Sequence, residues 1–308
     1  MELRQLRSFV TVVEEANFTR AAARLHLAQP GVSAQIRKLE RELGQPLLDR
    51  TGGAVTTTPA GEAVLPYARA ALTAVKGAQE AVEEFTGLLR GQVAIGLVSG
   101  AASRAFDVAS VLADFHDEHP HVGIALTEDT SERMLESLRQ GLLDIAVVGL
   151  VDERPPQGTR ARLVVDTPLV AAMAPGDPLL AVGDGSGVRL AALRERQLIS
   201  LPRGTGLRGV LERACAQAGF TPRVAFEAAA PALLAQFAAR GLGVAVIPDA
   251  PGETDPLPGL CTLPLTHPRL RGRVALTWRE TGPTSPAAQA LLDRLQDALP
   301  TPPVSPPT

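Results

Sequence analysis

The chain has 308 residues, of which 45% are hydrophobic and 20% charged, and its formal net charge is −3 at pH 7. This composition excludes a disordered protein and leaves room for two or three domains. Residues 1–60 hold eight Arg or Lys against six Asp or Glu, a surplus too small to indicate DNA binding by itself.

The two cysteines, Cys215 and Cys261, are too few for a secreted disulfide framework and lack the paired spacing of a zinc site. The N-terminus has charged and apolar residues at helical spacing and no secretion signal. Apolar stretches such as 93–98 are far shorter than the roughly 20 residues that cross a bilayer. We therefore expect a cytoplasmic protein without a membrane span.

Three helices are predicted at the front of the chain. The first has an apolar stripe at helical spacing, which consists of Leu3, Leu6, Phe9, Val10 and Val13. Asn17 is a good N-cap for a second, alanine-rich helix over residues 18–25. The third helix, residues 29–43, has Pro30 in its first turn and is expected to end at Gly44.

The third helix has the layout of a DNA recognition helix. Its predicted buried stripe is Val32, Ile36, Leu39 and Leu43. A separate face has short polar groups first and arginines later, and consists of Gln29, Pro30, Ser33, Ala34, Arg37 and Arg41. In such motifs early residues touch base edges and later arginines reach phosphates. Residues 45–58, with β-branched residues around Gly52-Gly53, predict a two-stranded wing over the minor groove.

The motif AnFTRAAArLHLaQPGVSaQIRkLErELGqPLLdR…TpAG, which begins at Ala16, resembles the DNA-binding domain of LysR-type transcriptional regulators. The likeness assigns base reading to Gln29, Pro30 and Ser33 and backbone support to Arg37 and Arg50. Ala34 and the glycine wing tip depart from the longer or basic residues of many relatives, so affinity is expected to depend partly on DNA shape and dimerisation. The alternatives are that residues 1–58 are only a packing domain and that the Ser33 hydroxyl bonds the backbone of its own helix.

A long helix is predicted from Thr58-Pro59 to about residue 89, with a local bend at Pro66. Its degenerate heptad stripe, suited to pairing with a second copy, consists of Leu65, Ala68, Leu72, Val75, Gln79, Val82, Thr86 and Leu89. The alternative is an ordinary long helix lying on its own domain. In the LysR family this helix dimerises the protein, which implies a homodimer or homotetramer on an interrupted inverted repeat of double-stranded DNA.

From residue 91 strands and helices alternate, which predicts an α/β fold of two lobes joined by two crossovers. The strands are expected at 93–98, 122–127, 144–148, 198–201, 224–226, 243–247 and 273–278, and the last helix at 286–299. Landmarks such as VAIGLVSG and FHDEHPHV resemble the LysR-type effector domain, which is similar to periplasmic solute-binding proteins. Residues 300–308 are too proline-rich for helix or sheet and are expected to be disordered.

Ligands of open α/β folds bind beyond the carboxyl ends of strands. The expected effector contacts there are Ser99, Ala101, Glu128, Asp129, Arg203, Thr205 and Gly206. Thr205 and Gly206 open a helix whose N–H groups, with Arg203, could hold a carboxylate or other anion. For Ser99 and Thr205 the alternative is simple capping of the helices that they precede.

Other patterns give weaker signals. Gly204, Gly206 and Gly209, followed by Glu227, fit a dinucleotide fingerprint but come late in the chain and after a short strand. Three histidines, His116, His119 and His121, are typical of a solvated helix end rather than a metal site. In peroxide-sensing relatives the position of Cys215 holds one of two reactive cysteines, but the partner position here is Gly206, so only single-thiol sensing stays open.

We therefore expect a sequence-specific DNA-binding transcriptional regulator of LysR type, with no catalysis, cofactor or metal. Its partners would be DNA, further copies of itself and the transcription machinery, and a small-molecule effector between the lobes would control it. The alternative is a solute-binding or dehydrogenase-like α/β protein whose N-terminal helices serve only assembly.

Overall fold

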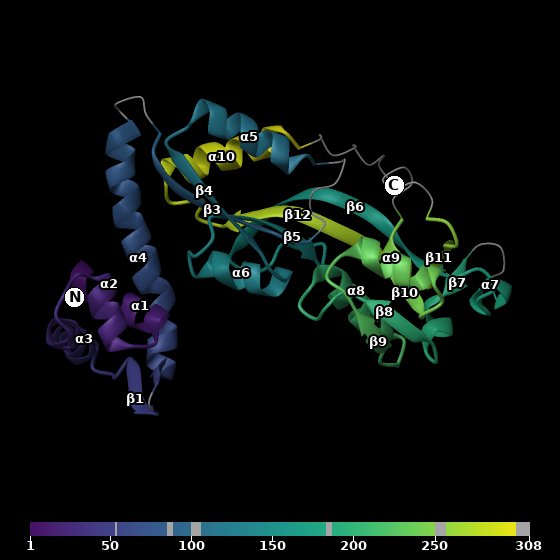
Figure 1. The fold of residues 1–308 in the computed structure, drawn as a ribbon, viewed down its shortest axis with the longest axis horizontal. Helices are drawn as coiled ribbons and strands as arrows, with labels where there is room; N and C mark the ends of the chain where they lie inside the picture. Colours follow the sequence, from purple (N-terminus) through teal and green to yellow (C-terminus); the bar gives the residue numbers. More distant parts are fainter. Residues whose placement is uncertain (53, 85–88, 100–105, 183–186, 250–256, 300–308) are drawn as a thin grey trace.

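The computed structural model describes residues 1–52, 54–84, 89–99, 106–182, 187–249 and 257–299. Figure 1 shows three parts: a small helical domain, a long helix, and two α/β lobes side by side. The described part of the chain contains no helix both long and apolar enough to span a bilayer. The N-terminal all-α unit and the two-lobed α/β unit agree with the predicted fold class.

The N-terminal domain consists of α1 (Leu3–Glu15), α2 (Phe18–Arg24), α3 (Gln29–Leu43) and a hairpin of β1 (Leu48–Gly52) and β2 (Ala54–Thr57). The predicted signals for these boundaries are present, since Asn17 accepts hydrogen bonds from the backbone N–H groups of Thr19 and Arg20. Gly44 ends α3 with a left-handed φ of 72°, a conformation in which a side chain would be strained.

The prediction that Leu3 and Leu43 belong to the core of this domain is wrong. Leu3 is 43% and Leu43 is 40% exposed. Polar residues are buried instead, because Ser8 donates a hydrogen bond to Gln35 at 2.5 Å and Gln5 donates one to Glu42 at 3.3 Å. Paired polar side chains cost little to bury, and an apolar pattern alone does not reveal them.

The long helix α4 (Pro59–Glu84) packs beside α1. Ala68 is buried in the core of the N-terminal domain, and Leu65 and Leu72 pack against that core. Ala68 therefore lies on its own domain, as the alternative interpretation expected, whereas Leu65 and Leu72 are only partly covered by it and their pairing with a second copy stays a prediction. Thr86 lies outside the described residues, and Leu89 packs into the core of the first lobe.

Lobe I has a sheet in the order β4-β3-β5-β12, which continues into β6. Its elements are β3 (Gly91–Leu97), α5 (Val108–Glu118), β4 (Val122–Glu128), α6 (Ser131–Arg139), β5 (Ile145–Leu150), β12 (Arg271–Arg279) and α10 (Pro286–Asp297). Helices α5 and α10 cover one face and α6 the other (Figure 1).

Lobe II continues the same sheet in the order β6-β10-β8-β9, with α8 and α9 on opposite faces. Its elements are β6 (Thr159–Met173), α7 (Leu179–Val182), β7 (Val188–Arg189), a 3-10 turn (Leu190–Leu193), β8 (Gln197–Ser200), α8 (Gly206–Gln217), β9 (Arg223–Glu227), α9 (Pro231–Ala239), β10 (Val244–Pro248) and β11 (Cys261–Thr266).

Strand β6 runs through both lobes and was not predicted. Its first part pairs with β12 of lobe I, and its last part pairs with β10 and β11. Asp166 and Pro168 interrupt its apolar pattern, and a proline argues against a central strand. Pro168 lies where the strand passes from one lobe to the other, and its carbonyl accepts a hydrogen bond from Asp249 N at 2.8 Å.

Candidate nucleic-acid interface and effector cleft

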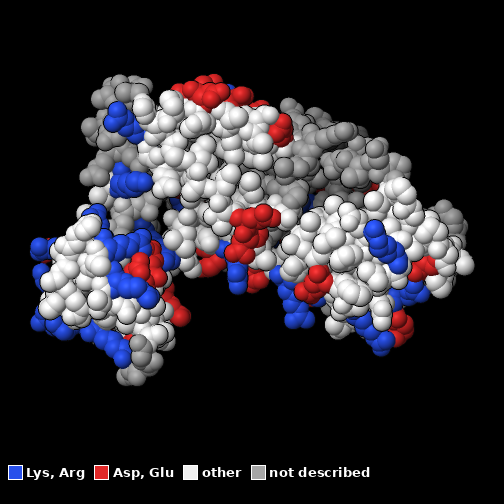
Figure 2. Space-filling model, in the orientation of Figure 1, with Lys and Arg blue, Asp and Glu red and all other residues white. Residues whose placement is uncertain are grey.

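The exposed face of α3 is the candidate DNA-reading surface. Gln29, Pro30 and Arg37 are exposed there, and Arg37 and Arg41 line a hollow of about 650 Å³ beside the chain after the helix. The guanidinium of Arg41 donates a hydrogen bond to the backbone carbonyl of Arg37 at 3.4 Å. Figure 2 shows further Lys and Arg side chains along the outer edges of this domain. Positive charges of this kind attract the phosphates of DNA.

Two predicted DNA contacts have partners inside the domain. Ser33 is 8% exposed, and its hydroxyl accepts a hydrogen bond from Arg37 Nη1 at 3.1 Å. The Arg50 guanidinium lies 5.0 Å from the centroid of the Phe18 ring and donates to Glu40 Oε2 at 3.1 Å. The structure thus shows Ser33 orienting Arg37, and Arg50 holding the first strand of the wing onto α2 and α3.

The two lobes touch where the carboxyl ends of their strands face each other. The backbone N–H of Glu132, at the start of α6, donates to the Gly204 carbonyl of lobe II at 3.0 Å. Gly206 lies against the backbone of Gly149, and a Cβ at position 206 would lie 2.3 Å from the Gly149 carbonyl carbon. Only glycine at position 206 permits this approach.

This contact accounts for the glycines of the dinucleotide-like fingerprint. A Cβ on Gly209 would meet Val151 of lobe I at 2.6 Å, and one on Gly204 would meet Glu132 at 3.0 Å. The carboxylate of Glu227 accepts a hydrogen bond from Arg208, a buried side chain, at 2.9 Å. Because lobe I fills the space over the glycines, the fingerprint does not form an open pyrophosphate cradle.

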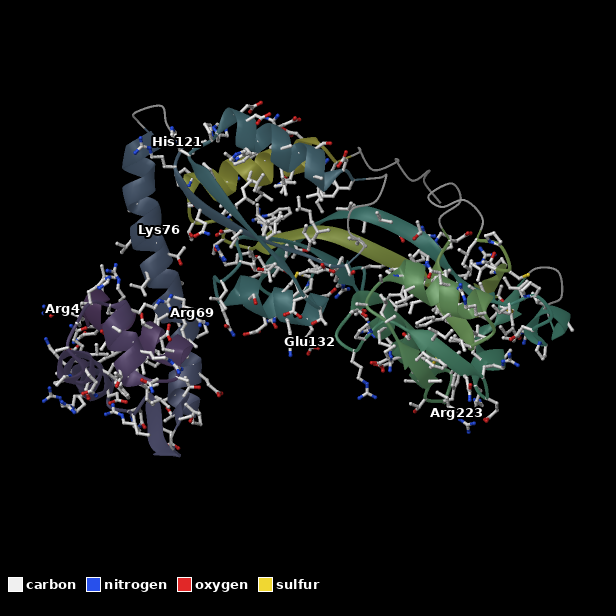
Figure 3. All side chains as sticks on the ribbon, in the orientation of Figure 1. Arg4, Arg69, Lys76, His121, Glu132 and Arg223 are labelled. Atoms are coloured by element: carbon white, nitrogen blue, oxygen red, sulfur yellow. The ribbon has the colours of Figure 1, made fainter. Side chains whose placement is uncertain are left out.

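A pocket of about 850 Å³ lies beside this contact and is lined by both lobes, through α6, residues 149–157 and the first turns of α8. Its charged residues are Glu132, Asp152, Glu153, Arg154, Glu212 and Arg213. Arg213 forms an ion pair with Asp152, and Glu153 pairs with Arg273 at 2.8 Å. Figure 3 shows Glu132 on the side of α6 that faces away from the sheet.

The structure brings only part of the predicted effector set to this pocket. Thr205 and Gly206 line it, and the Thr205 hydroxyl donates to the Pro202 carbonyl at 2.8 Å. Ser99, Glu128, Asp129 and Arg203 do not line it, and Ala101 lies outside the described residues. Sequence reasoning missed Ser131, the first residue of α6, and residues 150–157, at and after the end of β5, because neither belongs to a recognisable motif.

Asp129 and Arg203 have other partners. Asp129 accepts a hydrogen bond from the backbone N–H of Thr130 at 2.7 Å and pairs with Arg133 at 3.8 Å. Arg203 is 80% exposed and lies 3.6 Å from Glu212. Arg203 thus lies beside Glu212, an acidic residue of the pocket lining, and is not itself among the lining residues.

Cys215 is buried in α8, and burial raises the pKa of its thiol from 9.0 to about 11. The nearby Glu212 charge acts in the same direction. Reactive cysteines need the thiolate, so this environment opposes single-thiol sensing at neutral pH. No group of His, Cys, Asp or Glu suited to hold a metal ion occurs among the described residues, the three histidines near α5 included.

Comparison with known proteins agrees with both halves of the structure. Residues 3–62 match the family described as bacterial regulatory helix-turn-helix protein, lysR family, and residues 86–300 match the LysR substrate binding domain. The chain is 33% identical over 296 residues to the HTH-type transcriptional regulator ShiR of Corynebacterium glutamicum, covering 95% of this chain and 97% of that one.

The RuBisCO operon transcriptional regulator of Allochromatium vinosum is 32% identical over 249 residues, or 80% of this chain and 79% of that one. Full-length OxyR from Pseudomonas aeruginosa has a similar structure, with a TM-score of 0.67, 25% identity and coverage of 96% of this chain and 95% of that one. These matches confirm the predicted DNA-binding regulator and contradict the dehydrogenase alternative. The chain belongs to the LysR family of bacterial transcriptional regulators.

Proposed function

We propose that this chain acts in the cytoplasm as a homodimer, or a tetramer of dimers, that reads an interrupted inverted repeat with α3 and responds to a small effector held between its lobes. The observation that carries the proposal is the pocket lined by both lobes. A ligand that contacts two lobes binds more tightly to one of their arrangements and thereby shifts the population toward it.

For DNA reading, Gln29 and Pro30 lie exposed in the first turn of α3 and contact base edges in this proposal. Arg37 contacts a phosphate, and Ser33 acts by orienting Arg37 through the 3.1 Å hydrogen bond. Arg50 acts by holding the wing, since its charge already pairs with Glu40. Ser33 and Arg50 are thus positioning residues here.

Binding to the upstream DNA of its own gene and to scrambled DNA, titrated with salt, tests these roles. Gln29→Ala should reduce the difference in affinity between upstream and scrambled DNA, because it removes a base contact. Arg37→Ala should weaken binding to both DNAs and reduce by about one the slope of the logarithm of the binding constant against the logarithm of salt concentration. Ser33→Ala should behave as a weaker copy of Arg37→Ala.

Lys38→Ala is the matched control, because Lys38 lies on the same helix but points to Glu2 and Glu42. If Ser33→Ala lost its preference for upstream DNA but kept the salt dependence of the wild type, Ser33 would contact a base instead of orienting Arg37. Equal affinity of the wild-type protein for both DNAs would contradict the operator assignment.

The dimer is proposed to form through the outward face of α4. That face is separate from the stripe on the domain core, and its exposed members are Ala63, Tyr67, Ala70, Ala74 and Ala78. Tyr67 is 78% exposed, more than any other large apolar or aromatic side chain among the described residues. The spacings of four and three residues keep these side chains on one side of the helix, as helix pairing requires.

The effector is proposed to bind in the pocket of about 850 Å³, which is large enough for a small metabolite. Leu135 of α6 is partly buried in its wall, so Leu135→Trp should fill it with little effect on the fold. A panel of amino acids, sugars, carboxylic acids and aromatic acids is screened for compounds that raise the melting temperature of the wild-type protein.

Leu135→Trp should abolish the shift that any hit produces. Leu233→Trp, at a 38% exposed position on α9 outside the pocket, should keep it. A hit that stabilises the Leu135→Trp variant as much as the wild type would place the effector elsewhere.

A further inference from the structure

Helix α4 docks on lobe I as well as on the DNA-binding domain. Arg69 Nη1 donates a hydrogen bond to Gln140 Oε1, just after α6, at 2.8 Å. Two turns further, Gly77 is buried against the segment before α10, and a Cβ there would lie 2.2 Å from the Thr284 carbonyl oxygen. Figure 3 shows Arg69 on α4, at the level of the DNA-binding domain.

Arg69 joins three parts of the chain. It belongs to α4, it bonds Gln140 of lobe I, and its Nη2 lies 3.9 Å from Glu14 Oε1 of α1. The Gln140 amide is fixed by donating to Glu136 Oε1 at 2.7 Å, so its oxygen faces Arg69. The Arg69 side chain is 12% exposed, and its Nε–H is buried with no hydrogen-bond partner among the residues that the structure describes.

A buried donor left unpaired costs free energy, so this arrangement stores a penalty that another arrangement can release. Burial also lowers the pKa of Arg69, with the Glu14 charge opposing it, which shows that the guanidinium is partly desolvated. The guanidinium at the junction of α4, α1 and lobe I is therefore only partly satisfied by its partners.

Helix α6 connects this junction to the contact between the lobes. At its start, the Glu132 N–H donates to Gly204 of lobe II and Ser131 Oγ accepts from Gly149 N at 3.0 Å. At its end, Gln140 accepts from Arg69. A nine-residue helix moves as one rigid body, so its two ends respond together when the lobes rearrange.

We propose that α6 is a relay: a change in the lobe contact at Gly204 and Gly206 shifts α6, breaks or forms the Arg69–Gln140 bond, and so releases or docks the linker helix and the DNA-binding domain. This proposal rests on the proposed function, because it supplies a path from the effector pocket to α1. Its test needs no effector, because a bulky substitution between the lobes, here called a wedge, can disturb the lobe contact instead.

The first experiment measures hydrogen–deuterium exchange of α4 in the full-length protein without DNA. Gln140→Ala and Gly77→Leu should each speed exchange of the backbone amides around residues 69–77 about fivefold or more. Arg133→Ala, on the exposed side of α6, is the control and should leave them unchanged. Unchanged exchange in both docking variants would overturn the docking step.

The second experiment inserts a wedge with Gly206→Leu or, from the opposite lobe and less severely, Gly149→Ala. Either wedge should speed exchange in α4 of the otherwise wild-type chain and add little in a Gln140→Ala background. Equal effects in both backgrounds, or no effect of either wedge in the wild-type background, would overturn the relay.

The same variants are footprinted on the upstream DNA. A wedge should change the length or position of the protected DNA segment in the otherwise wild-type protein but not in the Gln140→Ala background. The same change in both backgrounds would overturn the relay. If no variant and no wild-type protein binds this DNA specifically, the proposed function fails, and the exchange measurements still decide the relay.

Discussion

Replacing Tyr67 by Asp should split the dimer and lower the affinity for the operator by roughly a hundredfold or more, because a single DNA-binding domain loses the avidity of two linked half-sites. Tyr67 is 78% exposed on α4 and faces neither the domain core nor lobe I. In a two-fold pairing of α4 helices, each Asp would lie close to its symmetry mate, and two like charges at such a seam repel.

The measurement is sedimentation of the free protein together with operator titration. Tyr67→Phe is the matched control and should remain dimeric. Mixing Tyr67→Asp with Tyr67→Lys should restore dimers and binding, since opposite charges then face each other. A Tyr67→Asp variant that sediments as a dimer and binds its operator normally would show that the seam lies on another face of α4.

Gly61→Ala should destabilise the DNA-binding domain by about 3 kcal/mol, near the upper end of the usual cost of overpacking a core. A Cβ on Gly61 would lie 2.0 Å from the Leu47 carbonyl oxygen, which is backbone and cannot rotate away. That oxygen already accepts a hydrogen bond from Thr58 N at 3.0 Å, and Thr58 Oγ1 accepts one from Gly61 N at 3.0 Å. The added methyl would break the junction of α4 with the wing.

Denaturation followed by two signals separates the domains. In Gly61→Ala, part of the helical circular dichroism signal should be lost earlier in the denaturation than in the wild type. The unfolding transition followed by fluorescence of Trp278, the only tryptophan, should stay where it is in the wild type, because Trp278 lies in lobe I. Gly31→Ala is the control: nothing lies within 4 Å of a Cβ there, so it should stabilise α3 by about 0.5–1 kcal/mol. Equal stability of the Gly61→Ala and wild-type domains would refute the steric argument.

Local signals in the sequence determine the elements that were predicted correctly. The Asn17 cap, the proline in the first turn of α3 and the left-handed Gly44 each act within a few residues, so the pattern shows them directly. The alternating strands and helices of both lobes follow for the same reason. Ser33 lies on the face that was predicted to read DNA, but the sequence pattern does not reveal that its hydroxyl accepts a hydrogen bond from Arg37.

Contacts between distant segments could not be predicted. Leu65 and Ala68 satisfy a heptad pattern equally well against a partner helix or against α1, and periodicity does not distinguish the two. Gly206 fits a phosphate-binding motif, but its glycine is required by Gly149, which is 57 positions earlier. The pocket depends on this same long-range approach of the lobes, so its lining was only partly foreseen.

The order of strands in lobe I has a consequence for synthesis on the ribosome. Strand β12, which lies between β5 and β6, and helix α10, which covers one face, come from the last forty residues of the described chain. Domains near the N-terminus fold first during translation. The DNA-binding domain and α4 are thus complete long before lobe I receives β12, so the proposed pairing through α4 would let two nascent chains on one messenger join while their effector domains are still being made.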